Sequence, residues 1–148
     1  MTTVNKTGST RIARIGAVVG AAVAGLIVWI VAQGVLDGGL RAPGFGNQGP
    51  RDVALAAVIV APVLAGLAAW ALLGILERRT SAPRRVWTIV ALVVLIVSLS
   101  APLSGSGVEG ADRVALLVEH LAVGAVLIAG LGRTASPTRR GAPATAAA

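Results

Sequence analysis

The chain contains no cysteine, only one histidine, and four aromatic residues, one phenylalanine and three tryptophans. Without cysteine it can form no disulfide, thiolate metal site or cysteine nucleophile. The single histidine, His120, excludes a metal site or haem ligated by two histidines of one chain. Charged residues are also scarce, at 13% of the chain, whereas soluble domains carry about 25%. We therefore expect no soluble globular domain, no resident metal and no cofactor.

Hydrophobic residues, by contrast, make up 55% of the chain and gather in four long runs with almost no charge. As helices these runs cover about 15–36, 53–76, 86–103 and 112–132. Each run is long enough to cross a hydrocarbon core of roughly 30 Å at about 1.5 Å per residue. The predicted fold class is all-α, an integral membrane four-helix transmembrane bundle within residues 11–133. The polar segments 1–10 and 134–148 are expected to be disordered, and the glycine- and proline-rich loop 37–52 to be irregular.

The basic residues predict how the chain lies in the membrane. Ten of the thirteen lie in the N-terminal segment, the second loop and the C-terminal segment, which share one side in a four-pass chain. Positive charge stays in the cytoplasm, so both termini are predicted to be cytoplasmic, in the cell membrane. The net charge of +7 is expected to face anionic lipid headgroups rather than nucleic acid, because the basic residues lie at membrane boundaries. The predicted headgroup contacts of the second loop are Arg78, Arg79, Arg84 and Arg85.

Small residues four positions apart predict where helices approach closely in lipid. These residues are Gly16 and Gly20 in the first helix and Ala57, Ala61 and Ala65 in the second. Packing within the bundle is the favoured interpretation, and homodimerisation is the alternative. Trp70 and Trp87 are predicted to anchor the helices at the cytoplasmic interface.

The fourth helix contains Glu119 and His120 well inside the membrane. A charged group at that depth costs roughly 2.5 to 3.5 kcal/mol, so it normally faces protein or water. Other polar groups are predicted at the same outer depth, and Pro62 is expected to kink the second helix there. The candidate polar cavity is Glu119, His120, Gln33, Trp29, Ser98 and Ser100. These groups either bond within the bundle, which is the favoured interpretation, or form a proton- or cation-linked site, or line a pocket for an apolar ligand or lipid.

No catalytic motif accompanies these residues. His120 has no acidic neighbour apart from Glu119 to orient it, and the chain contains no P-loop and no HExxH sequence. We therefore expect no enzymatic activity but a non-catalytic scaffold or a partner of another membrane protein. The alternative is a small proton- or cation-linked transporter or channel-like homo-oligomer that uses Glu119 and His120. A lipid-modifying membrane enzyme is the hypothesis with the least support.

Short segments of the chain resemble a family of small four-helix actinobacterial membrane proteins of unknown function. The resemblance covers roughly residues 11–133 and implies a four-pass fold with no established activity. It is carried by Leu76-Glu77-Arg78, Trp87, Ser98-Leu99-Ser100-Ala101-Pro102-Leu103, His120-Leu121 and Val126-Leu127-Ile128.

Overall fold

The chain forms helices joined by short connections and one small hairpin. A computed structural model describes residues 6–44, 46–104 and 106–137, without the side chains of Lys6 and Thr7. In chain order the elements are α1 (Lys6–Val35), β1 (Arg41–Ala42), β2 (Arg51–Asp52), α2 (Leu55–Arg79), α3 (Pro83–Ser98), α4 (Ser100–Ser104) and α5 (Gly110–Thr134).

Four helical spans within the described residues are long and apolar enough to cross a membrane. The third is formed by α3 and α4 together, Pro83–Ser104, because Leu99 N–H donates to Leu95 O across the junction at 3.1 Å. The predicted all-α class and four-helix bundle are therefore confirmed. Large apolar side chains that point outward, such as Ile27, Leu64 and Ile96, are more than half exposed on all four spans, as expected for a lipid-facing surface.

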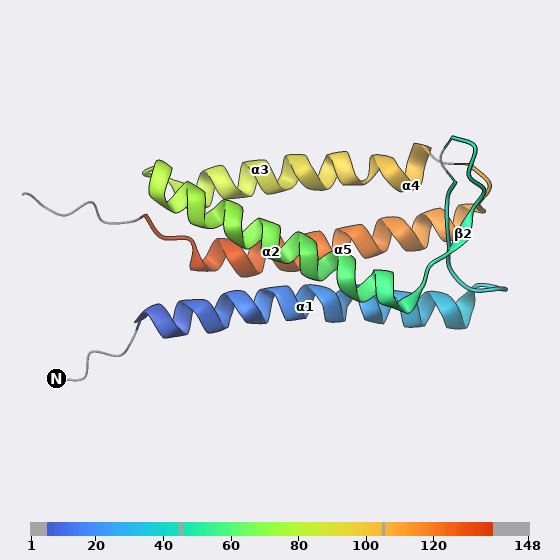
Figure 1. Ribbon diagram of the computed structural model, residues 1–148, viewed down its shortest axis with the longest axis horizontal. Helices are drawn as coiled ribbons and strands as arrows, with labels where there is room; N and C mark the ends of the chain where they lie inside the picture. The colour runs from blue at the N-terminus through green and yellow to red at the C-terminus, as the bar shows by residue number, and fades with distance from the viewer. Residues whose placement is uncertain (1–5, 45, 105, 138–148) are drawn as a thin grey trace, which may run out of the picture.

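Helix α5 lies at the centre of the bundle. Figure 1 shows α1 along one side of α5, α3 along the other, and α2 crossing from α1 towards α3. One end of the bundle combines the start of α1, the turn 80–82 and the end of α5; we call it the arginine-rich end. The opposite end contains the loops 36–54 and 106–109, and we call it the loop end. Each end has its own apolar cluster, around Leu73 and Leu131 at the first and around Leu40 and Leu116 at the second.

Glycines allow the helices to approach closely. A Cβ built at Gly130 of α5 would lie only 2.6 Å from Ala17 Cβ of α1, and one at Gly66 of α2 only 2.9 Å from Val18 Cγ2. These distances are too short for a real Cβ atom. The helices can therefore approach this closely only because glycine has no side chain at the contact. Gly124 has the same function against Leu95 of α3, where the built Cβ would lie 2.7 Å from Leu95 Cδ1.

Packing within the bundle, the favoured interpretation of the small-residue stripes, holds for only one of their members, and homodimerisation through the stripes stays a prediction. Gly20 does pack in the bundle, half-buried opposite Val126, but the other members of both stripes are exposed: Gly16, Ala57, Ala61 and Ala65. Helix α2 instead buries Val58, Pro62 and Gly66, the stripe one position further along. In a helix so rich in alanine, spacing alone does not show which of two adjacent stripes faces inward.

The helix boundaries also differ from the predicted ones. Helix α1 begins at Lys6, so residues 6–10 are helical and the predicted disorder of this segment is wrong there; residues 1–5 lie outside the described part. Helix α2 continues to Arg79 and α5 to Thr134. Apolar runs mark only the part of a helix in hydrocarbon, whereas backbone hydrogen bonds continue into the headgroup region. Of the predicted disordered C-terminal segment, residues 138–148 lie outside the described residues.

The loop 37–52 is mostly irregular, as predicted, but contains a small antiparallel hairpin. Strands β1 and β2 pair with Arg41 opposite Asp52 and Ala42 opposite Arg51. Gly44 pairs with Ser106 of the other loop at this end. Leu40, only 1% exposed, packs beneath the hairpin with Ala32 and Leu116, so the loops close this end of the bundle.

Candidate functional site

Glu119 lies on α5 where this helix meets α1 and α2. A Cβ built at Gly25 of α1 would lie 3.6 Å from Glu119 Oε1, 3.6 Å from Pro62 Cγ and 3.4 Å from Val123 Cγ2. Because Gly25 has no side chain, there is space beside it for the carboxyl group of Glu119. Both Gly25 and Pro62 are buried, and Glu119 is half-buried. Sequence reasoning identified Glu119 and Pro62 but missed Gly25, although it faces Glu119 at the same depth.

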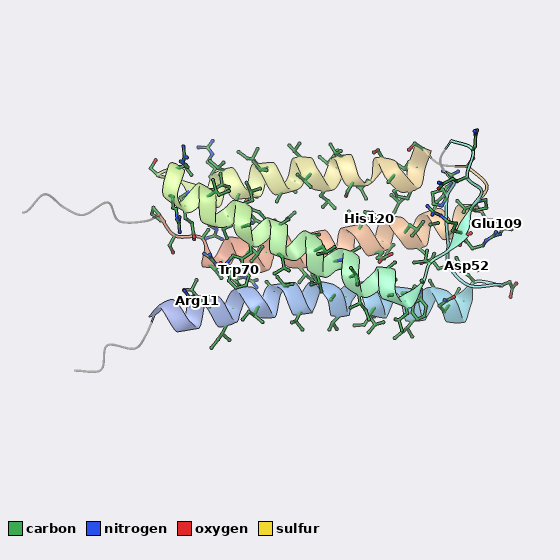
Figure 2. The ribbon with its side chains drawn as sticks, viewed as in Figure 1. Arg11, Asp52, Trp70, Glu109 and His120 are labelled. Carbon is green, nitrogen blue, oxygen red and sulfur yellow. The ribbon has the colours of Figure 1, made fainter. Side chains whose placement is uncertain are left out.

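Within the described residues, no hydrogen bond joins Glu119 to the other residues of the predicted polar cavity, which bond to backbone groups instead. The hydroxyls of Ser98 and Ser100 donate to Leu95 O and Val97 O of their own helical turn, at 2.7 and 2.6 Å. His120, in the half of α5 nearer the loop end (Figure 2), has Nδ1 2.8 Å from Leu116 O. Since each group has a backbone partner, the structure does not bring these residues together as one constellation.

Trp29 and Gln33 connect α1 to the loop that follows it. The Trp29 indole donates from Nε1 to Val53 O at 2.8 Å, and Gln33 Oε1 accepts from Leu40 N–H at 3.1 Å. Both contacts hold the loop 36–54 onto the helix rather than lining an opening. Helix α2 is continuous through Pro62, and a kink at that residue stays a prediction.

Charged side chains also form hydrogen bonds to backbone groups at the loop end. Asp112, 7% exposed, accepts from Arg41 N–H at 2.9 Å through Oδ1. Arg113 donates from Nη1 to Leu103 O at 2.8 Å and to Pro102 O at 3.1 Å. A cationic side chain on the final carbonyls of α4 satisfies acceptors that have no partner within the helix.

Among the described residues, the most extensive polar network lies at the arginine-rich end, and sequence reasoning missed it. Arg14 of α1 forms an ion pair with Glu77 of α2, with Nη2 2.6 Å from Oε1 and side chains only 10% and 14% exposed. Arg14 also donates from Nε to Thr134 Oγ1 at 3.0 Å and from Nη2 to Thr134 O at 3.3 Å. Ser136 N–H donates to Glu77 Oε1 at 3.0 Å. The ends of α1, α2 and α5 are thereby tied together.

One signal in the sequence could have indicated this network. Glu77 is the only acidic residue on the side of the membrane predicted to carry ten basic residues. A lone carboxylate among so many cations is well placed to pair with one of them. The predicted second helix ends at Leu76, whereas Glu77 lies within α2.

Two open pockets lie at the arginine-rich end. The first, of about 830 Å³, opens between α1, α2 and the end of α5; we call it the inner groove. Its lining residues are Thr10, Arg11, Arg14, Trp70, Ala71, Gly74, Glu77, Arg78, Thr134 and Ser136. The second, of about 610 Å³, lies between the α2–α3 turn and residues 135–137, with Arg84 and Arg85 in its wall. Three of the predicted headgroup contacts, Arg78, Arg84 and Arg85, thus border pockets, and Arg79 is exposed beside them.

The two tryptophans predicted as interfacial anchors differ in their surroundings. Trp87 is only 2% exposed and donates from Nε1 to Ile128 O at 3.3 Å, so it belongs to the packed core of this end, and its role as an interfacial anchor stays a prediction. Trp70 is half-buried and lines the inner groove. The acidic and histidine side chains of the described residues form no group of three that could hold a metal ion.

A family model described as "Family of unknown function (DUF6069)" matches residues 5–137. No curated protein and no solved structure matches the chain.

Proposed function

We propose that this chain, which belongs to the family of unknown function DUF6069, is a rigid, non-catalytic membrane scaffold that binds another membrane protein or a second copy of itself. One observation supports this most strongly: part-buried hydrogen bonds and an ion pair join separate elements at both ends of the bundle. Arg14 joins α1 to α2 and α5 at one end. Asp112 and Trp29 fasten the loop 36–54 at the other.

These polar contacts between helix ends favour a function that needs no large movement of the helices. Alternating access requires one part of a bundle to rock against the rest, and here that would separate Arg14 from Glu77 or Thr134. The outward faces of all four spans offer apolar side chains, and Ile96 of α3, for example, is 67% exposed. These are the faces that a lipid or a partner helix would cover.

The test compares photo-crosslinking with ion flux. A photoreactive amino acid at Ile96 is expected to give one crosslinked product of defined mass in native membranes, whereas the same group at buried Leu131 gives none. Vesicles containing the purified protein are expected to show no proton or potassium flux above empty vesicles. A ladder of unspecific products from Ile96, with no discrete band, would contradict the scaffold.

Proton- or cation-linked transport is a second candidate, because the carboxyl group of Glu119 lies at the junction of three helices. A proton or potassium flux that is abolished by Glu119→Gln but preserved by Glu109→Gln would favour transport over the scaffold. Glu109 is the matched control, since it is an exposed carboxylate before the first residue of the same helix.

We also propose that the bilayer is the cell membrane and that the arginine-rich end faces the cytoplasm. The ten basic residues of the N-terminal segment, second loop and C-terminal segment support this orientation.

A further inference from the structure

The lining of the inner groove combines exposed arginines near the end of the bundle with less polar residues further along α2. Arg11 of α1 and Arg78 of α2 are both exposed, and within the described residues neither guanidinium has a partner. Further into the bundle the wall is formed by Trp70, Ala71 and Gly74 of α2. Figure 2 shows Arg11 and Trp70 on neighbouring stretches of α1 and α2 at this end of the bundle.

The length of the groove matches the headgroup and upper acyl region of a lipid. Trp70 precedes Arg78 by eight positions, which is about 12 Å along a helix. Since α2 ends at Arg79, an α2 that spans a membrane would place Arg78 at headgroup depth and Trp70 deeper, below the interface at which tryptophan is enriched. Nothing lies within 4 Å of a Cβ built at Gly74, so the groove is open to an acyl chain or glycerol group between them.

The charge of the groove selects the headgroup. Glu77 neutralises Arg14 and also accepts from Ser136 N–H, so Arg11 and Arg78 are left as the lining cations that have no partner in the described part of the chain. A phosphodiester between two guanidiniums can form charge-assisted hydrogen bonds to both. A zwitterionic headgroup would bring an ammonium group that finds no unpaired carboxylate among the lining residues.

We infer that the inner groove is a binding site for one phospholipid with a net negative headgroup, its phosphate between Arg11 and Arg78 and its glycerol and upper acyl chain along Trp70 and Gly74. This site goes beyond the proposed scaffold and does not depend on it. It differs from general attraction to an anionic membrane surface, because one pocket holds one lipid.

Native mass spectrometry of the full chain in an uncharged detergent tests the site by counting retained lipids. With phosphatidylglycerol we expect one lipid per chain, and with phosphatidylcholine little retention. Because each arginine near the surface is worth about fivefold in affinity for anionic lipid, the double variant Arg11→Gln/Arg78→Gln is expected to weaken phosphatidylglycerol binding about thirtyfold. Gly74→Leu, which fills the groove without changing charge, is expected to displace the lipid as well.

The control variant is Arg79→Gln, which removes one charge next to Arg78 but outside the groove lining. It is expected to leave retention within about twofold of the unmodified protein. Circular dichroism and the melting temperature show whether each variant is folded. If Gly74→Leu fails to fold, Arg11→Gln/Arg78→Gln still tests the site, because substitutions of exposed arginines are expected to leave the fold intact. Three results would each overturn the site: equal retention of the two lipids, an effect of Arg79→Gln as large as that of the double variant, or full competition by inorganic phosphate.

Discussion

A single guanidinium, that of Arg14, holds three helix ends together. If Arg14→Met removes it, Glu77 keeps its buried position without a cation, and breaking such a pair costs about 3–5 kcal/mol. We expect the free energy of unfolding in detergent micelles to fall by about that amount. The double variant Arg14→Met/Glu77→Met should recover most of the loss, because two apolar side chains of similar length then replace the ion pair.

The matched control is Arg84→Met, which removes an exposed arginine from the same end of the bundle. Surface substitutions of this kind usually change stability by less than about 0.5 kcal/mol. If Arg14→Met and Arg84→Met lowered the free energy of unfolding equally, the Arg14–Glu77 ion pair would add no more to stability than an exposed arginine does. The proposal of a rigid scaffold would then lose its main support.

At the same scale, sequence patterns identify which residues are unusual but not which residues meet. Glu119 was recognisable as a carboxyl group deep in an apolar helix, because its chemistry conflicts with its neighbours. Its contact with Gly25 was not, because a glycine in a glycine-rich helix gives no local signal. The pairing of Arg14 with Glu77 depends on three helix ends meeting at one place, and 63 positions separate the two residues.

At the scale of the element, length and apolarity were sufficient to predict the four spans, since a run that crosses the hydrocarbon must satisfy its backbone as a helix. It was harder to predict which face of each helix points into the bundle. Helix α2 offers alanines at 57, 61 and 65 and a second stripe at Val58, Pro62 and Gly66, one position later. Only the helix that packs against it, with Val18 opposite Gly66, decides between them.

The contact between α1 and α5 gives a test of the inward faces. Gly130→Ala places a Cβ 2.6 Å from Ala17 Cβ, so the two helices must separate. Overpacking of this kind costs about 1–3 kcal/mol, and we expect a melting temperature below that of a variant with alanine at an uncrowded helical glycine, in thermal unfolding followed by circular dichroism.

Gly16→Ala is the control for this substitution, because nothing lies within 4 Å of a Cβ at that position. Both glycines are helical, so alanine brings the same intrinsic gain of about 1 kcal/mol to each. The difference between the two variants therefore isolates the interhelical contact. A Gly130→Ala protein as stable as Gly16→Ala would mean that α1 and α5 are not packed this closely.

At the scale of the whole molecule, the distribution of charge distinguishes the two ends of the bundle. The arginine-rich end has Arg14 and Glu77 as its buried pair and exposed cations around them, and it carries both pockets. The loop end is closed by the hairpin and by Leu40. If the anionic lipid site and the cytoplasmic orientation are both correct, the inner leaflet supplies the lipid.

The orientation is tested with reporters of known compartment. Alkaline phosphatase fused after Ala148 is expected to be inactive, because the arginines that flank α2, α3 and α5 keep this end in the cytoplasm. The same enzyme inserted after Asn47, in the exposed part of the loop end, is expected to be active, and a fluorescent protein after Ala148 to be bright. Active phosphatase at Ala148 would reverse the orientation. The inner groove would then face the outer leaflet, and the excess of arginine at its mouth would need a cause other than topology.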